Sequence, residues 1–243
     1  MKIIGVIPSR YESSRFPGKP LALINGKPMI YWVYKQAIKV KGLDEVVVAT
    51  DDDRILKTCQ EYEINAMMTS NDIVTGADRV AEVAEKTDGD IYLNIQGDEP
   101  LIQPEAIEQI IEKMLEDNDI YYLGLRAEFE NEEEWLATNT VKVVTDVYDN
   151  AMYFSRSPIP SNDYKKAYRV LGLYGYKRDF LLKFKKLGLS SLEKAEKGVE
   201  MLRAMEAGYK VRLIDTKYHT IGVDLPEHIS LVEQEMDRLN WDK

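Results

Sequence analysis

The sequence contains almost no cysteine or histidine. Cys59 is the single cysteine in 243 residues, which excludes an intramolecular disulfide and a cysteine-based zinc cluster. His219 and His228 are the two histidines, too few for a polyhistidine metal site. Any catalytic chemistry must therefore come from carboxylates, Lys, Arg and backbone amides.

Positive charge is in deficit, and long apolar runs are absent. The chain has 32 Lys and Arg against 42 Asp and Glu, a net charge of −10. This excess of negative charge argues against broad binding to nucleic acid or anionic membrane. The apolar run at residues 3–7 is too short for a signal sequence or a membrane-spanning helix. We therefore expect a cytoplasmic protein with no nucleic-acid partner and no membrane insertion.

Strand and helix patterns alternate through the first half of the chain. Short apolar runs at residues 3–7, 46–49, 66–68 and 91–95 predict buried strands. Amphipathic segments at residues 28–38, 51–62, 78–85 and 104–115 are predicted to be helices, and each follows one of these strands. This order is typical of an α/β fold with a mixed, mostly parallel sheet flanked by helices.

The second half has a different pattern. Strands predicted at residues 141–144 and 151–154 flank Asp149 and Asn150, which indicates a hairpin turn. Further strands are predicted at residues 169–176 and 211–214, with helices at 192–208 and from about Pro226. No linker divides the chain. We expect one domain over residues 1–243, with about 130–170 as an inserted hairpin lobe suited to a dimer contact.

The loop after the first predicted strand, residues 8–20, is rich in cations and small polar residues. It contains Arg10, Arg15 and Lys19 together with Ser13, Ser14 and Gly18. A triphosphate needs fixed cations, hydroxyl or amide donors, and close approach of the backbone. The Walker pattern G-x-x-x-x-G-K-[ST] is absent. We interpret the loop as a triphosphate site; an exposed basic loop is the alternative.

Collinear motifs extend over nearly the whole chain. They read IPSRY at 7–11, SRFPGKPL at 14–21, GKPMI at 26–30, VATD at 48–51, NIQGDEP at 94–100, VKVV at 141–144, YFSRSPIP at 153–160 and GVD at 222–224. Together they resemble the motifs of the 3-deoxy-manno-octulosonate (KDO) cytidylyltransferases. The resemblance implies a Rossmann-like nucleotidyltransferase fold, usually a homodimer. It also implies transfer of CMP from CTP to the anomeric hydroxyl of KDO, with release of pyrophosphate, in lipopolysaccharide or capsule biosynthesis.

The resemblance also assigns roles to individual residues. Arg15, Lys19, Asp98 and Asp224 are the expected catalytic residues, and the two aspartates are the expected ligands of Mg²⁺. Magnesium prefers a few carboxylates, with phosphate oxygens and water completing its shell. His219 lies near Asp224 in the sequence and is an alternative general base, although a metal makes a dedicated base unnecessary. The preference for CTP over UTP rests on the resemblance alone.

The remaining candidates form a nucleotide set and an acceptor set. The expected nucleotide-binding residues are Pro8, Ser9, Arg10, Ser13, Ser14, Arg15, Lys19, Thr50, Asp51, Thr75, Arg79 and Gln96. The expected contacts to a small acidic acceptor are Gln96, Arg156, Tyr174, Glu200 and Arg203. Structural roles are the alternatives for three of these: Tyr174 as a core residue, and Glu200 with Arg203 as a surface pair.

Four motifs on the acceptor side depart from the family pattern. The sequence IVTGA at 73–77 replaces His-x-Ser-Gly-Thr, Val170 replaces a His, Met201 replaces a Gln, and Leu225 replaces a Thr. A site built for hydroxyls discriminates through such polar partners. We therefore hypothesise an altered acceptor, such as a modified ulosonic acid. The alternatives are a phosphonate or phosphate ester, or a non-catalytic nucleotide-binding protein, against which the intact catalytic residues argue.

Overall fold

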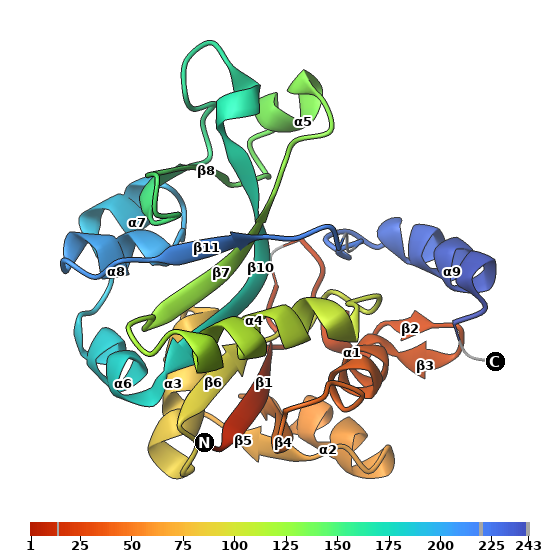
Figure 1. Cartoon of the computed structure of the whole chain (residues 1–243). Coiled ribbons are helices and arrows are strands. Elements are labelled where there is room, and N and C mark those ends of the chain that lie inside the picture. Colours follow the sequence, from red (N-terminus) through yellow and green to blue (C-terminus); the bar gives the residue numbers. More distant parts are fainter. Residues whose placement is uncertain (14, 219–220, 242–243) are drawn as a thin grey trace. The chain divides into compact units, whose positions relative to one another are not determined.

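The computed structural model describes residues 1–13, 15–218 and 221–241, and the chain divides into two compact units (Figure 1). Unit 1 comprises Met1–Gln109 and Tyr218–Lys243, and unit 2 comprises Ile110–Lys217. Unit 2 contains the segment predicted as an inserted lobe. Among the described residues, no helix has both the length and the apolar composition needed to cross a membrane.

The core of unit 1 is a parallel sheet whose strands lie in the order β6-β1-β4-β5 (Figure 1). Strand β1 (Ile3–Ser9) lies between β4 (Glu45–Thr50) and β6 (Ile91–Asn94), and β5 (Ala66–Met68) pairs with the other edge of β4. Ile4, Val6 and Ile7 of β1 have no exposed surface. A parallel strand covered on both faces requires such a continuous apolar run.

Three helices connect these strands and set the position of the ligand site. The chain passes through α1 (Met29–Ala37) and α2 (Asp53–Glu61) in one direction across the sheet, then returns through α3 (Gly76–Lys86) past β1 to β6. Because such crossovers are right-handed, α3 covers the face opposite to α1 and α2. The reversal leaves a switch point at the carboxyl ends of β1 and β6, where open α/β sheets bind ligands.

The rest of unit 1 surrounds this sheet. The single-turn helix η1 (Lys19–Leu21) and the hairpin of β2 (Leu23–Ile24) and β3 (Lys27–Pro28) follow the first loop. Helix α4 (Pro104–Glu116) crosses the boundary into unit 2. Helix α9 (His228–Leu239) buries Val232 and Met236 against Ile24, Met29 and Trp32. Helix α9, near the carboxyl end of the chain, therefore packs against β2 and α1, near the amino end.

Unit 2 is built on strand β7 (Tyr122–Ala127). This strand pairs antiparallel with β10 (Tyr168–Lys177) and parallel with β11 (Arg212–Asp215). Strand β8 (Lys142–Thr145) pairs antiparallel with β10 and with β9 (Ala151–Ser155). The helices are α5 (Glu132–Leu136), α6 (Arg178–Lys186), α7 (Ser191–Ala195) and α8 (Met201–Glu206), and η2 (Tyr164–Lys166) is a further short turn. Tyr122 packs against Tyr174, Tyr176, Phe180 and Phe184 in an aromatic cluster.

The predicted α/β fold and the hairpin at residues 141–154 are confirmed, but the single helix predicted over 192–208 is wrong. Helix α7 ends at Ala195, and α8 begins only at Met201. Between them Lys197 and Gly198 take positive φ values of 54° and 88°, and the N–H of Gly198 donates to the carbonyl of Glu193 at 2.8 Å. This is a left-handed helix ending, which glycine adopts without steric cost.

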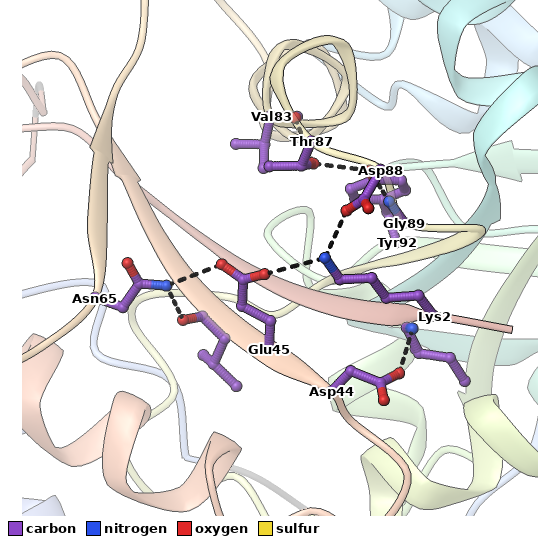
Figure 2. Close-up of polar contacts among 11 residues, drawn as sticks. Lys2, Asp44, Glu45, Asn65, Val83, Thr87, Asp88, Gly89 and Tyr92 are labelled. Carbon is purple, nitrogen blue, oxygen red and sulfur yellow. Dashed lines mark hydrogen bonds and ion pairs between the residues drawn. The ribbon is translucent and has the colours of Figure 1, made fainter.

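A polar network ties the amino ends of the unit 1 strands together (Figure 2). The ammonium of Lys2 donates to Asp88 and lies 3.7 Å from a carboxylate oxygen of Glu45. Glu45 in turn accepts from the amide of Asn65 at 3.2 Å. These side chains are between about one third and largely exposed, so the network contributes little stability. It lies at the side of the sheet away from the switch point.

Replacement of Gly89, which precedes β6, tests the packing at this end of the sheet. A Cβ atom there would lie 2.9 Å from both Ile4 Cδ1 and Tyr92 Cζ, closer than side chains tolerate. We expect Gly89→Ala to lower the free energy of unfolding by about 1–3 kcal/mol, measured by urea denaturation. Gly222→Ala is the control because nothing lies within 4 Å of its Cβ position. Equal stabilities for the two variants would contradict the close packing at Gly89.

Candidate active site

A cavity of about 240 Å³ lies at the switch point between β1 and β6. Its walls come from the loop after β1, the loop before α3 and the loop after β6. The lining residues are Pro8, Ser9, Arg10, Ser13, Arg15, Lys19, Pro20, Val74, Thr75, Gly76, Arg79, Gln96, Gly97 and Asp98. The loops that follow three different strands, β1, β5 and β6, thus meet around one cavity.

Lys19 and Asp98 form an ion pair across this cavity. The Nζ atom of Lys19 donates to Oδ2 of Asp98 at 2.6 Å, and the two side chains are 16% and 30% exposed. Lys19 is placed by a turn at Gly18, which has a φ of 71° and donates its N–H to the carbonyl of Tyr11 at 2.8 Å. The first loop therefore folds back on itself and directs a lysine to the loop after β6.

Arg15 and Asp224 form a second, more exposed pair at 2.9 Å, with side chains 59% and 38% exposed. The backbone brings Asp224 here, because the N–H of Val223 donates to the carbonyl of Asp98 at 2.9 Å. The N–H of Asp224 donates to Nδ1 of His228 at 3.2 Å. Two carboxylates far apart in the sequence thus belong to neighbouring segments, each beside a cation of the first loop.

Gly97 permits the two central loops to approach this closely. A Cβ atom on Gly97 would lie 2.9 Å from the carbonyl oxygen of Pro8 and 3.1 Å from Oγ of Ser9. No side chain fits there without displacing Asp98 from the loop after β1. Gly97 was not among the site residues named from the sequence, although its position directly before Asp98 and just after a predicted strand was a usable signal.

The carboxylates of Asp98 and Asp224 fit a magnesium ion better than a structural metal. Among the residues that the structure describes, no group of three or more His, Cys, Asp or Glu side chains is placed to hold a metal. Magnesium is commonly held by one or two carboxylates, with phosphate oxygens and water as its other ligands. Asp98 and Asp224 are partly exposed and supply that number of carboxylates.

Asp51 and Arg79, both expected to contact the nucleotide, form an ion pair with one another. Arg79 is 3% exposed, and its Nη2 lies 2.6 Å from Oδ2 of Asp51. Its Nη1 donates to the hydroxyl of Thr69. Asp51 and Thr50 do not line the cavity, and Thr50 has no exposed surface. The pair joins the end of β4 to α3, and any contact of these residues with a nucleotide stays a prediction.

The expected acceptor residues are placed in different parts of the molecule. Gln96 lines the cavity of unit 1, whereas Arg156, Tyr174, Glu200 and Arg203 belong to unit 2. Tyr174 is 7% exposed and packs edge-on against Tyr122. This agrees with the alternative interpretation, in which Tyr174 is a core residue. Whether any of them contacts an acceptor stays a prediction.

Arg203 has a strong partner within the protein. Its guanidinium makes two hydrogen bonds to the carboxylate of Glu193, at 2.8 and 2.7 Å, and both side chains are 1% exposed. It also lies over the ring of Phe184. The surface-pair alternative for Glu200 and Arg203 is wrong, because both residues are buried. Two residues named from the sequence, Ser14 and His219, lie outside the described residues.

Comparisons with known proteins agree with this geometry. A family model described as cytidylyltransferase matches residues 4–214. The chain is 43% identical to a 3-deoxy-manno-octulosonate cytidylyltransferase of Geobacter metallireducens, over 98% of this chain and 99% of that protein. It is 45% identical to a protein of the same name from Fusobacterium nucleatum, over 96% of both chains. The resemblance drawn from the motifs is confirmed.

Solved structures give the same result. A structure of CMP:2-keto-3-deoxy-manno-octonic acid synthetase complexed with CTP matches with a TM-score of 0.91 and 42% identity, covering 98% of this chain and 100% of that one. A 4-diphosphocytidyl-2C-methyl-D-erythritol synthase from Anaerococcus prevotii matches over 98% of this chain and 99% of its own, with a TM-score of 0.66. At 16% identity the second match shows a shared fold only.

The pairing of Asp51 with Arg79 predicts a stability effect in the absence of any ligand. Asp51→Asn leaves a buried guanidinium without its countercharge, and we expect the free energy of unfolding to fall by about 2 kcal/mol. Asp53→Asn, an exposed neighbour in the first turn of α2, is the control, with an expected change below about 1 kcal/mol. Urea denaturation without nucleotide measures both. A variant at Asp51 as stable as the wild type would rule out a structural role for this pair.

Proposed function

Because this chain belongs to the 3-deoxy-manno-octulosonate cytidylyltransferase family, we propose that it transfers CMP from CTP to KDO or a modified ulosonic acid and releases pyrophosphate. The proposal rests chiefly on the cavity at the switch point, where the cations of the first loop lie beside Asp98 and Asp224. That combination of fixed positive charge and paired carboxylates suits a magnesium-bound triphosphate.

The first loop and the start of α3 form the proposed triphosphate site. Arg10, Arg15 and Lys19 line the cavity with positive charge. Gly76, the first residue of α3, also lines it, and the amino end of a helix favours phosphate. The hydroxyl of Thr75 caps α3 by accepting from the N–H of Asp78 at 3.2 Å. Loop cations and helix end thus converge on one volume.

Asp98 and Asp224 are the proposed ligands of Mg²⁺. When bound, the metal neutralises charge on the triphosphate and lowers the pKa of the attacking hydroxyl. The two carboxylates are paired with Lys19 and Arg15. The phosphates of CTP offer these cations a more highly charged partner. Entry of the nucleotide would then release both aspartates for the metal.

Charge balance defines the proposed reaction. The anomeric oxygen of the acceptor attacks the α-phosphorus, and the bond from that phosphorus to the oxygen bridging to the β-phosphate breaks. The hydroxyl proton passes to solvent, and pyrophosphate leaves with the bridging oxygen and its electron pair. Lys19 and Arg15 stabilise the charge that accumulates on the phosphates. Their fixed placement also orients the triphosphate for attack.

The identity of the acceptor is the open part of the proposal, and apolar residues at polar positions of the family motifs favour an altered one. Met201 stands at the position of the family glutamine. A thioether there offers a sugar hydroxyl no strong hydrogen-bond partner. A modified ulosonic acid is therefore the favoured acceptor within the proposal. A non-ulosonic acid such as a phosphonate is the second candidate.

Two further expectations stay predictions. A homodimer is favoured by the exposed apolar side chains of the hairpin that joins β8 and β9, where Val147, Tyr148 and Met152 are 91%, 70% and 62% exposed. Exposed apolar groups clustered on one hairpin are typical of a protein–protein contact. The second expectation is the cytoplasmic location indicated by the sequence.

An acceptor screen tests the proposed function. Pyrophosphate release would be followed with CTP, Mg²⁺ and one acid at a time: KDO, 8-amino-KDO, other 2-keto acids and small phosphonates. We expect the highest kcat/KM with KDO or a modified ulosonic acid, and a lower value when UTP replaces CTP. Efficient turnover of KDO alone would contradict the altered acceptor. Binding of CTP without pyrophosphate release from any acid would overturn the proposed activity.

Removal of the metal or of its ligands tests the role of the ion pairs. EDTA should abolish pyrophosphate release, and excess Mg²⁺ should restore it. We expect Asp98→Asn and Lys19→Met each to lower kcat/KM by about 10²- to 10³-fold, because each removes charge stabilisation at the phosphates. Asp237→Asn, an exposed residue of α9, should leave kcat/KM unchanged. Full activity in EDTA, or in the Asp98 variant, would disprove these assignments.

A further inference from the structure

Arg156 directly follows β9, and both its backbone N–H and its backbone carbonyl are hydrogen-bonded to ionisable side chains. Its N–H donates to Oε2 of Glu196 at 2.7 Å. Its carbonyl accepts from Nζ of Lys142 at 2.8 Å. These contacts come from residues on β8 and in the segment after α7, so they fix Arg156 relative to two other elements of unit 2.

Glu196 makes several contacts to the same short stretch of chain. Besides the N–H of Arg156, its carboxylate accepts from the hydroxyl of Ser155 at 3.1 Å and from the phenol of Tyr153 at 3.3 Å. Burial and the neighbouring charge of Glu196 raise the pKa of Tyr153, which keeps this phenol protonated as a donor. The carbonyl of Glu196 accepts from Nε of Arg156 at 3.0 Å. One residue therefore holds both the backbone and the side chain of Arg156.

Lys142 completes the arrangement from inside the unit. It has no exposed surface, and its ammonium donates to the carbonyls of Ala137, Thr140 and Arg156. Burial, and then the positive charge of Arg156, lower the pKa of Lys142. An ammonium has three N–H donors, and here each has a carbonyl to bond. The loop containing Thr140 and the end of β9 are therefore joined through one buried group.

The orientation of the Arg156 guanidinium is fixed as a result. Its Nε–H donates to the backbone carbonyl of Glu196, and its Nη1 lies 3.3 Å from the carbonyl of Asn139. The plane of the guanidinium is thus defined by contacts on two sides. A guanidinium held in one plane is well suited to a carboxylate, and because the single Nε–H of Arg156 is donated to Glu196, the acid would approach the terminal Nη groups.

We propose that Glu196 is a positioning residue for the acceptor, holding the Arg156 guanidinium in the orientation that binds the carboxylate of the incoming acid. This inference rests on the proposed function and on the expectation from the sequence that Arg156 contacts the acidic acceptor. Glu196 acts through Arg156 and takes no part in the phosphoryl chemistry. The position also precedes Lys197 and Gly198, the left-handed pair that separates α7 from α8. That helix ending places Glu196 outside the regular helix, where its carbonyl can accept from Arg156.

Acceptor kinetics provide the first test. With CTP saturating, Glu196→Gln should raise the KM for the acid about tenfold, because a small misorientation of a binding group weakens contact with the substrate. The Kd for CTP should stay within about twofold of the wild type, and kcat should change less than KM. Glu206→Gln is a matched control, since Glu206 accepts from Ser191 Oγ at 2.7 Å and Leu192 N at 3.1 Å but makes no contact to Arg156.

A double-mutant cycle separates positioning from general stability. In an Arg156→Ala background, Glu196→Gln should raise the acceptor KM no further, because the group it positions has gone. An additional increase in that background would assign Glu196 a structural role only and overturn the proposal. An unchanged KM in the single variant would overturn it as well.

A spectroscopic test does not depend on turnover. In arginine-¹⁵N-labelled protein, the Nε–H signal of Arg156, assigned with Arg156→Lys, should be protected from exchange by its bond to the backbone carbonyl of Glu196. Glu196→Gln weakens the carboxylate's bonds to Ser155 and to the N–H of Arg156, which hold that carbonyl in place, so it should accelerate the exchange about tenfold or more. Glu206→Gln should not accelerate it. Unchanged exchange in the Glu196 variant overturns the positioning role. Absence of turnover with every acid overturns the proposed function instead, so the two failures are distinguishable.

Discussion

The candidate site depends on one ion pair, between Lys19 and Asp98. It joins the loop after β1 to the loop after β6 at the point where the sheet reverses its direction of winding. Gly97 makes the approach possible, since a side chain there would meet the backbone of Pro8. A partly buried ion pair gains little net stability, because desolvation offsets most of the attraction. The pair is therefore well suited to exchange: each member can take a ligand of opposite charge at small net cost to the fold.

Much of the fold could be predicted because apolar periodicity reports burial directly. Strand β5 has the predicted bounds, residues 66–68, and the other strands of the parallel sheet in unit 1 differ by a residue or two. The break between α7 and α8 could not be read this way, since the apolar pattern continues while the backbone at Gly198 turns left-handed. Strand β7 was not predicted at all. Its buried Arg126 interrupts the apolar pattern, and the carboxylates that neutralise it, on Asp149 and Asp215, come from distant positions.

The residues of the candidate site were predictable from the sequence to different degrees. Arg15, Lys19, Asp98 and Asp224 were named from motifs, and the structure brings them into two ion pairs. Arg79 and Arg203 were also named, and each is buried against a carboxylate of the protein. The motifs did not indicate these partners, because the contacts to Asp51 and Glu193 depend on how separate segments of the chain pack. Any contact of the two arginines with a substrate stays a prediction.

The hydrogen bond from Val223 to the carbonyl of Asp98 has a consequence for the order in which the site is completed during synthesis. The triphosphate loop and Asp98 belong to Met1–Gln109, while Asp224 follows Ile110–Lys217 in the sequence. Chains emerge from the ribosome amino end first, and domains generally fold as they emerge. The sheet of unit 1 can therefore assemble with its loop cations facing a single carboxylate. The second carboxylate arrives only after all of unit 2 has been made, so the candidate site is completed late in synthesis.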